Sequence, residues 1–82
     1  MFYVYILQSL KDGRTYVGYS EDPERRLVEH NSGCNKSTKN RMPFKIIYLE
    51  KFLSQKEAKV RELYWKSGAG RRKMRDFFRI EF

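Results

Sequence analysis

The sequence has few of the residues that bind zinc or form cross-links through sulfur. Its 82 residues include one cysteine, Cys34, and one histidine, His30. A single cysteine excludes an intrachain disulfide, and one cysteine with one histidine excludes a zinc site built from clustered Cys and His ligands. Any catalytic metal ion must therefore rest on carboxylate oxygen and water, a donor set that suits Mg²⁺ or Mn²⁺.

Long apolar runs, repeats and low-complexity tracts are also missing. No apolar run approaches the length of a transmembrane helix, and the N-terminus lacks a basic segment followed by an apolar signal core. We therefore expect a soluble, cytoplasmic protein with no membrane partner.

A hydrophobic content of 40% with 16% aromatic residues is enough for one core. A chain of this size buries roughly 60% of its unfolded surface, so residues 1–82 should form a single domain.

Acidic residues are outnumbered by basic ones. The 18 Lys and Arg residues against 10 Asp and Glu residues give a formal charge of +8. Such a surface attracts polyanions through phosphate contacts and the release of counterions. Nucleic acid is therefore the favoured partner.

The first half of the chain predicts a β-hairpin followed by a helix. Residues 2–8 and 15–19 are rich in β-branched and aromatic residues, and Asp12-Gly13 between them is a turn signal. The first strand is apolar at successive positions, which is typical of a central strand covered on both faces. Asp22-Pro23 reads as an N-cap and first helical position, and Ser32-Gly33 suits the end of that helix.

The second half predicts a loop, a strand and two helices. Residues 33–43 form a polar, basic loop, and residues 44–52 are the third strand candidate. Ser54 and Glu57 have the spacing of a capping box, which opens a helix that runs through Lys66 and that Gly68 ends. The tail from Arg71 to Phe82 has apolar side chains at helical spacing and predicts a short amphipathic helix, with Met74, Phe77 and Phe78 on its apolar face.

Several polar residues fall where they could do chemistry, although each has an ordinary explanation. Arg26 and His30 are four residues apart and project from one helix face, which is also what a solvated face would show. Glu62 lies on or beside the face of the later helix that should pack on the sheet, and an arginine ion pair explains it better than a metal ion when it is taken alone. Packing explains each hairpin tyrosine, but Gly18 weakens a strand and often marks the close approach of another group.

Taken together, these residues resemble the GIY-YIG nuclease family over nearly the whole chain. Tyr3-Val4-Tyr5 stands where the family has Gly-Ile-Tyr, and Tyr16-Val17-Gly18 stands where it has Tyr-Ile-Gly. The segment Pro-Glu-Arg-Arg-Leu-Val-Glu-His-Asn matches the family's Arg and His helix, and Glu-Ala-Lys-Val-Arg-Glu matches the helix that carries its glutamate. By that match the acid is Glu62 and not Glu57. Tyr3 departs from the motif's usual glycine, as in other short members.

The resemblance implies an α/β domain of the α+β type, with a three-stranded antiparallel sheet flanked by helices. It also implies a short stand-alone bacterial protein related to DNA-repair and homing nucleases. The expected activity is metal-dependent hydrolysis of phosphodiester bonds. The implied catalytic residues are Tyr5, Tyr16, Arg26, His30 and Glu62.

The resemblance assigns roles to these residues. Glu62 would hold the single divalent ion, and Arg26 would grip the scissile phosphate with its planar guanidinium. One tyrosine would take a proton from the attacking water, and we favour Tyr16 with Tyr5 beside it. His30 would be a hydrogen-bonding neighbour of the tyrosine or the phosphate, and a neutral imidazole as the base stays open.

Binding of the substrate would fall to basic residues outside the catalytic group. We expect these to be Lys36, Lys39 and Arg41 in the loop and Arg71, Arg72, Lys73 and Arg75 in the tail. No separate recognition domain reads base edges, so we predict dependence on the shape of the nucleic acid, with DNA favoured over RNA.

A protein partner that supplies targeting stays open. The alternatives are a catalytically silent nucleic-acid-binding module and a basic assembly protein, for instance one on ribosomal RNA, in which Glu62 makes only an ion pair.

Overall fold

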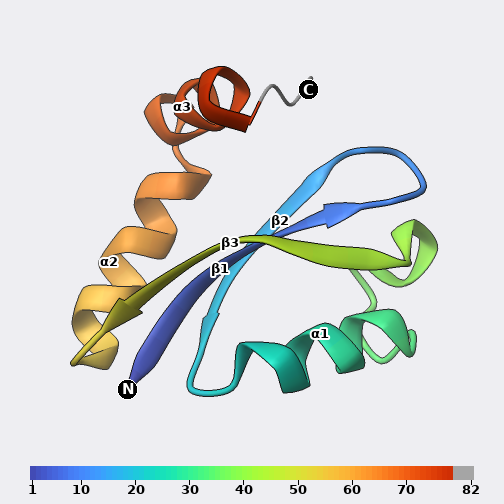
Figure 1. The fold of residues 1–82 in the computed structure, drawn as a ribbon, viewed down its shortest axis with the longest axis horizontal. Coiled ribbons are helices and arrows are strands. Elements are labelled where there is room, and N and C mark those ends of the chain that lie inside the picture. The colour runs from blue at the N-terminus through green and yellow to red at the C-terminus, as the bar shows by residue number, and fades with distance from the viewer. Residues whose placement is uncertain (79–82) are drawn as a thin grey trace.

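Three antiparallel strands form the centre of the computed structural model, which describes residues 1–78. The strands β1 (Phe2–Ser9), β2 (Thr15–Ser20) and β3 (Phe44–Phe52) pair in the order β2-β1-β3 (Figure 1). Strand β1 is therefore central, as its continuous apolar sequence predicted. The hairpin turn is also confirmed, because Gly13 has a φ of +76°, a left-handed conformation that glycine adopts without steric cost.

Helix α1 (Pro23–Asn31) covers one face of the sheet. Its N-cap is Asp22, whose carboxylate accepts a hydrogen bond from the backbone N–H of Arg25 at 3.1 Å. Its last residue, Asn31, exchanges hydrogen bonds with the backbone of Phe44 at 2.6 and 3.1 Å, which ties the helix end to the start of β3. On this face Tyr5 and Leu7 of the central strand are buried.

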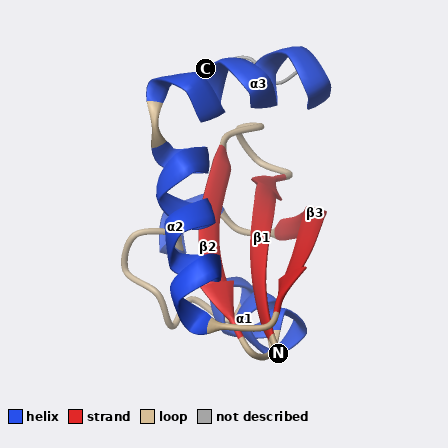
Figure 2. Cartoon of the chain, turned by 90° about the vertical axis from the view of Figure 1, so that its left-hand side faces the viewer, coloured by secondary structure: helices blue, strands red, loops and turns tan. Residues whose placement is uncertain are grey.

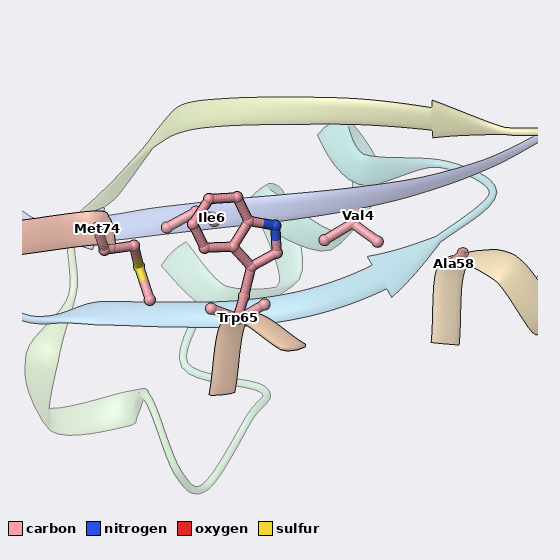
Figure 3. Close-up of a cluster of buried hydrophobic side chains, with 6 residues drawn as sticks. Val4, Ile6, Ala58, Trp65 and Met74 are labelled. Atoms are coloured by element: carbon pink, nitrogen blue, oxygen red, sulfur yellow. The ribbon is translucent and has the colours of Figure 1, made fainter. Parts of the chain in front are cut away.

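Helices α2 (Gln55–Lys66) and α3 (Gly68–Phe78) cover the opposite face. Figure 2 shows α2 running beside β2 and α3 crossing the ends of the strands. Ser54 caps α2 as predicted by accepting a hydrogen bond from the N–H of Glu57 at 3.2 Å, and its hydroxyl donates to Oε1 of Glu57 at 3.0 Å, where a full capping box would use the backbone N–H of Ser54. In Figure 3 the indole of Trp65 extends over Ile6 of β1 and packs beside Met74 of α3.

The tail helix differs from the sequence prediction at its start. It begins at Gly68 and not at Arg71, so Gly68 opens α3 where it was expected only to end α2. The reason is Ser67, whose extended backbone turns the chain and whose hydroxyl accepts a hydrogen bond from the N–H of Gly70 at 3.2 Å. Met74 is buried, whereas Phe77 is 71% exposed and does not belong to the packed face.

Two further features of the described chain complete the fold. A 3₁₀ turn at Lys39–Arg41 lies within the predicted loop. None of the helices in residues 1–78 combines the length and the apolar character needed to cross a membrane. The part of the predicted tail helix that falls on residues 79–82 lies outside the described residues.

Candidate active site

The candidate site lies at β2, the edge strand, where a side chain is missing. Tyr5 of the central strand pairs with Gly18 of β2, and a Cβ atom placed on Gly18 would lie 2.5 Å from the Tyr5 hydroxyl oxygen. The phenol therefore lies directly across the glycine, and no other residue type leaves room for it there. This contact explains why the motif needs glycine opposite tyrosine.

Arg26 of α1 reaches the same phenol. Its guanidinium lies close enough to the Tyr5 phenol to act on the pKa of that group, and its Nη1 donates a hydrogen bond to Oε1 of Glu29 at 3.0 Å. Burial raises the pKa of Tyr5 above its ordinary value of 10.0, and the arginine only partly offsets this. Tyr5 therefore stays a neutral phenol near neutral pH, which suits a residue that positions Arg26 better than a residue that accepts a proton.

His30 is one turn further along α1 and is 1% exposed. Its Nδ1 lies 2.8 Å from the hydroxyl oxygen of Thr38, which is fully buried, while its Nε2 is buried and has no hydrogen-bond partner among the described residues. Burial lowers the pKa of His30 below 6.5, and the charge of Arg26 lowers it further. The imidazole is therefore neutral at neutral pH.

Tyr16 of β2 completes an aromatic group around His30. The centre of its ring lies 4.6 Å from that of His30 and 6.5 Å from that of Tyr5. Unlike Tyr5 and His30, it is only partly buried, and it lines a surface pocket along β2. Of the two tyrosines, Tyr16 is thus the one that a substrate can reach.

Glu62 approaches from α2, on the other side of the sheet. Its side chain is 15% exposed, and its Oε1 lies 3.6 Å from Nζ of Lys66 one turn later. Its negative charge also raises the pKa of Tyr5, so the carboxylate lies near enough to that phenol to act on it electrostatically. Among the described residues Glu62 does not form the arginine ion pair that we considered for it. The arginine beside it in the sequence, Arg61, pairs with Glu50 instead, with its Nε 2.9 Å from Oε1 of Glu50.

The donor set near Glu62 is compatible with one magnesium ion. Within residues 1–78 no cluster of three or more His, Cys, Asp or Glu side chains could hold a metal ion. Mg²⁺ commonly keeps several waters and takes only one or two protein carboxylates together with substrate phosphate oxygens. A single, mostly buried carboxylate whose protein partner is a lysine ammonium 3.6 Å away fits that pattern, since a bound cation could replace the ammonium.

The basic residues expected to bind nucleic acid do not form one surface. Arg41 and Arg71 line the same pocket as Tyr16, whereas Lys36 lines a different hollow beside Arg26 and His30. Arg41 is also held by the protein, with Nε 3.3 Å from Oδ2 of Asp12. The remaining members are exposed and line neither hollow: Lys39, Arg72, Lys73 and Arg75.

Three residues at this site were missed by reasoning from the sequence. Thr38 gave no signal, because a threonine in a polar loop is ordinary until the fold buries it against His30. Arg14 was passed over as part of the hairpin turn, although it lines the pocket with Tyr16. Lys66 could have been found, since it follows Glu62 by four residues and so had to lie beside it on the helix.

Comparison with known proteins gives matches along most of the chain. Residues 1–75 match the family model described as the GIY-YIG catalytic domain. A UPF0213 protein of Clostridium perfringens is 45% identical over 67 residues, which cover 80% of this chain and 71% of that protein. A UPF0213 protein of Staphylococcus saprophyticus is 39% identical over 74 residues, which cover 89% of each chain.

A solved structure is similar as well. The solution NMR structure of a UPF0213 protein from Bacillus halodurans superimposes with a TM-score of 0.56 at 37% sequence identity. The superposition covers 94% of this chain and 85% of that one. The α+β fold with a three-stranded antiparallel sheet is thus shared with that protein.

Proposed function

This chain belongs to the GIY-YIG family, a family of nucleases, and we propose that it is a divalent-metal-dependent endonuclease that hydrolyses phosphodiester bonds in DNA. The observation that carries the proposal is the close approach of the Tyr5 phenol to Gly18 with Arg26 beside it, because it groups a phenol and a guanidinium at the edge strand, within electrostatic reach of Glu62 of α2. A tyrosine that only packed in the core would need no glycine opposite it.

In this proposal Arg26 binds the scissile phosphate. A guanidinium is permanently charged and presents a planar fork that matches two phosphate oxygens. Its interaction with the Tyr5 phenol and its ion pair with Glu29 restrict the direction in which that fork points. Because the Arg26 side chain is still 43% exposed, a phosphate can reach it.

Glu62 is the residue that would hold the metal ion. When bound, Mg²⁺ or Mn²⁺ supplies positive charge to a non-bridging phosphate oxygen and to the departing 3′ oxygen. The task of Glu62 is to keep one carboxylate oxygen available at the edge of the sheet. Lys66 would move away from Glu62 when the cation arrives, which frees the ammonium for the substrate.

Tyr16 is our choice for the group that accepts the proton of the attacking water. Tyr5 and His30 are both 1% exposed, so water reaches neither of them as readily as it reaches Tyr16. His30 then acts on Tyr16 through ring packing at 4.6 Å, as a positioning residue held in place by Thr38. For the step to balance, Tyr16 reacts as the phenolate: its oxygen takes one proton from water, the hydroxide oxygen bonds to phosphorus as the bond from phosphorus to the 3′ oxygen breaks, and the released 3′ oxygen takes up a proton from solvent.

The experiment that tests this proposal is cleavage of labelled single-stranded, flapped, branched and duplex DNA with Mg²⁺, Mn²⁺ or EDTA. Glu62→Gln should lower the rate at least about 100-fold, and Arg26→Lys should lower it by a similar factor. Glu57→Gln is the matched control for the acid, because glutamine also serves at that position of a capping box. Arg25→Lys is the matched control for the arginine, since its side chain is 75% exposed and lies one residue away.

The outcomes separate the nuclease from its rivals. Metal-dependent cleavage that both site variants lose and both controls retain supports the proposal, and the substrate cut fastest gives the preferred shape. If the wild type binds DNA but no protein cuts it with any metal, the chain is a catalytically silent binding module. Faster cleavage of the same shapes in RNA would correct the choice of DNA.

A further inference from the structure

A basic pocket borders the candidate active site on the side of α3. It lies along β2, has a volume of about 490 Å³ and is lined by side chains from the hairpin, the loop and both C-terminal helices. The lining residues that matter here are Arg14, Tyr16, Arg41, Trp65, Lys66 and Arg71. Because Arg14 and Lys66 come from segments that carry no binding motif, the pocket exists only in the folded chain.

We propose that this pocket binds the sugar-phosphate backbone of one single-stranded segment, next to the bond that is cut. This inference rests on the proposed function only where it refers to cleavage, because binding of the backbone is a separate property with its own test. It assigns Arg14, Arg41, Lys66 and Arg71 to a single site and names single-stranded nucleic acid as its ligand.

The charge of the pocket supports a phosphate ligand. Four cationic side chains line it, and no acidic side chain does. Within residues 1–78 neither Arg14 nor Arg71 forms an ion pair, while Arg41 and Lys66 are each paired with one carboxylate, of Asp12 and Glu62. At least two positive charges therefore face the pocket without a neutralising partner, which is the arrangement that favours binding of phosphate groups with release of counterions.

The Arg41 side chain, which lines the pocket, is held in place by several contacts. Its Nη2 donates a hydrogen bond to the backbone oxygen of Thr15 at 3.2 Å, and its Nε lies 3.3 Å from the carboxylate of Asp12. The guanidinium is also stacked near Phe44, with its carbon 5.7 Å from the ring centre. A guanidinium held by three contacts loses little side-chain entropy when a phosphate binds beside it.

The size of the pocket selects a single strand. A volume of about 490 Å³ lies within the range of roughly 300–1,000 Å³ that is typical of small-molecule sites, so one nucleotide fits and a duplex does not. Trp65 offers no stacking surface, because it is 2% exposed. Recognition is therefore of the backbone and not of the base, and we expect little preference for sequence.

The pocket and the candidate active site share residues. Tyr16 lines the pocket and packs against His30, and Lys66 lines the pocket while its ammonium lies 3.6 Å from Glu62. A strand seated in the pocket would thus place a neighbouring phosphate beside Tyr16. Flapped or single-stranded DNA would follow this path more readily than an intact duplex.

Fluorescence anisotropy with a labelled 12-nucleotide oligo(dT), and with a duplex of the same length, tests the inference in EDTA. The variant Arg14→Ala/Arg71→Ala removes two exposed cations of the pocket and should weaken single-strand binding at least about tenfold, while duplex binding changes at most about twofold. The control Lys51→Ala/Lys59→Ala removes the same charge from exposed positions outside the pocket and should change single-strand binding at most about twofold. Arg71→Glu is a second variant, with a larger expected loss.

A second readout separates this inference from the proposed function. Bis(p-nitrophenyl) phosphate is a diester too small to span the pocket, so its metal-dependent hydrolysis by the wild type, and the loss of that hydrolysis in Glu62→Gln, tests the nuclease without the pocket. Selective loss of single-strand binding without hydrolysis of any diester by the wild type would uphold the pocket and overturn the nuclease. Equal weakening by the pocket and control variants, or equal weakening for single strand and duplex, would overturn the pocket.

Discussion

At Gly18 the missing side chain leaves the space that the Tyr5 phenol occupies against the edge strand. Tyr5 points toward the face covered by α1, yet its hydroxyl lies across β2, where it meets Arg26 and feels the charge of Glu62 from α2. A side chain on Gly18 would occupy that place. Gly18 has no side chain to take part in the chemistry, yet it controls whether Tyr5 and Arg26 can lie together.

Gly18→Ala should displace the Tyr5 ring, because the added Cβ would lie 2.6 Å from the phenol Cζ as well as 2.5 Å from its oxygen. We expect a loss of about 1–3 kcal/mol in the free energy of unfolding and at least about a tenfold loss of DNA cleavage. Gly13→Ala is the control, because its φ of +76° costs roughly 1–2 kcal/mol of strain while nothing lies within 4 Å. Urea unfolding and cleavage rates measure both. Equal activity of the two variants would contradict the role of Gly18.

His30 is the residue whose charge state the fold controls most directly. The neutral imidazole has two tautomers, and the hydroxyl of Thr38 decides between them by donating to Nδ1 or accepting from it. The same hydroxyl lies 3.5 Å from the backbone oxygen of Asn35, to which it can donate. If it does so, Nδ1 carries the hydrogen and the free lone pair is on Nε2, where a neighbouring donor could use it.

The lowered pKa of His30 makes stability depend on pH. The unfolded chain takes up a proton near pH 6.5 and the folded chain only at lower pH, so below pH 6.5 the unfolded state binds more protons and stability falls. The slope from this residue can reach about 1.4 kcal/mol per pH unit. Urea unfolding between pH 7.5 and 5.5 should show that slope in the wild type and a clearly smaller one in His30→Gln. Equal slopes would mean that His30 titrates normally in the folded protein.

The carboxyl groups whose pKa the fold changes titrate outside the range from pH 7.5 to 5.5. Hydrogen bonds to Asp12 lower its pKa, the largest coming from the Arg14 N–H. The pKa of Glu50 is lowered too, because hydrogen bonds from Trp65 and Arg61 outweigh the opposing effect of burial. Both carboxylates lose their contribution to stability only as pH falls below their ordinary values near 4, outside the range measured.

Among the elements, α3 depends on a close approach to the end of α2. Gly70 lies in its first turn, and a Cβ there would overlap the backbone oxygen of Tyr64 and lie 2.6 Å from the Cα of Trp65. All of these are backbone atoms and cannot rotate away. The contact seats Met74 in the core beside Trp65 and holds Arg71 at the pocket.

Gly70→Ala should push α3 off α2 and lower the free energy of unfolding by about 3 kcal/mol. Gly68→Ala, two residues earlier in the same helix, meets only the flexible end of Arg72 at 4.0 Å. It should be neutral or raise stability by up to about 1 kcal/mol, because alanine favours helix more than glycine does. Thermal or urea unfolding of the two variants measures the difference. Similar stability for both would show that α3 is seated in some other way.

For the whole molecule, the sign and excess of charge matter more than any one lysine. The net charge of +8 is spread over a body with a radius of gyration of 12.2 Å. Exposed basic residues lie in the loop, on both C-terminal helices and on β3. A field of this kind draws in nucleic acid of any sequence, and the geometry of the site then selects where it is bound.

Affinity for single-stranded DNA should accordingly fall steeply with salt. If four phosphates are contacted, the dissociation constant should rise about 50-fold between 50 and 200 mM salt. Anisotropy titrations at four salt concentrations give the slope directly, and an uncharged peptide nucleic acid of the same sequence is the control. A flat salt dependence would contradict phosphate binding.

The sequence by itself determined the order of the elements and most of their bounds. The central strand, the Asp12-Gly13 turn and the capping of α2 by Ser54 follow from local rules about apolar runs, left-handed turns and side-chain caps, and all three are present in the structure. These features depend on neighbours within a few residues along the chain. That is why they could be predicted before any packing was known. The same local rules misplaced the start of α3, because the close contact of Gly70 with α2 is not local.

Only the tertiary structure decided which residues meet. Tyr5 and Gly18 are paired by strand register, Thr38 meets His30 because the loop folds back on α1, and Arg14 joins Arg71 at a pocket between distant segments. The roles of Tyr5, Tyr16, Arg26, His30 and Glu62 stay predictions until the variants are measured. Burial and side-chain contacts across the sheet set which of these groups are neutral, exposed or paired, and such contacts leave no periodic trace in a sequence.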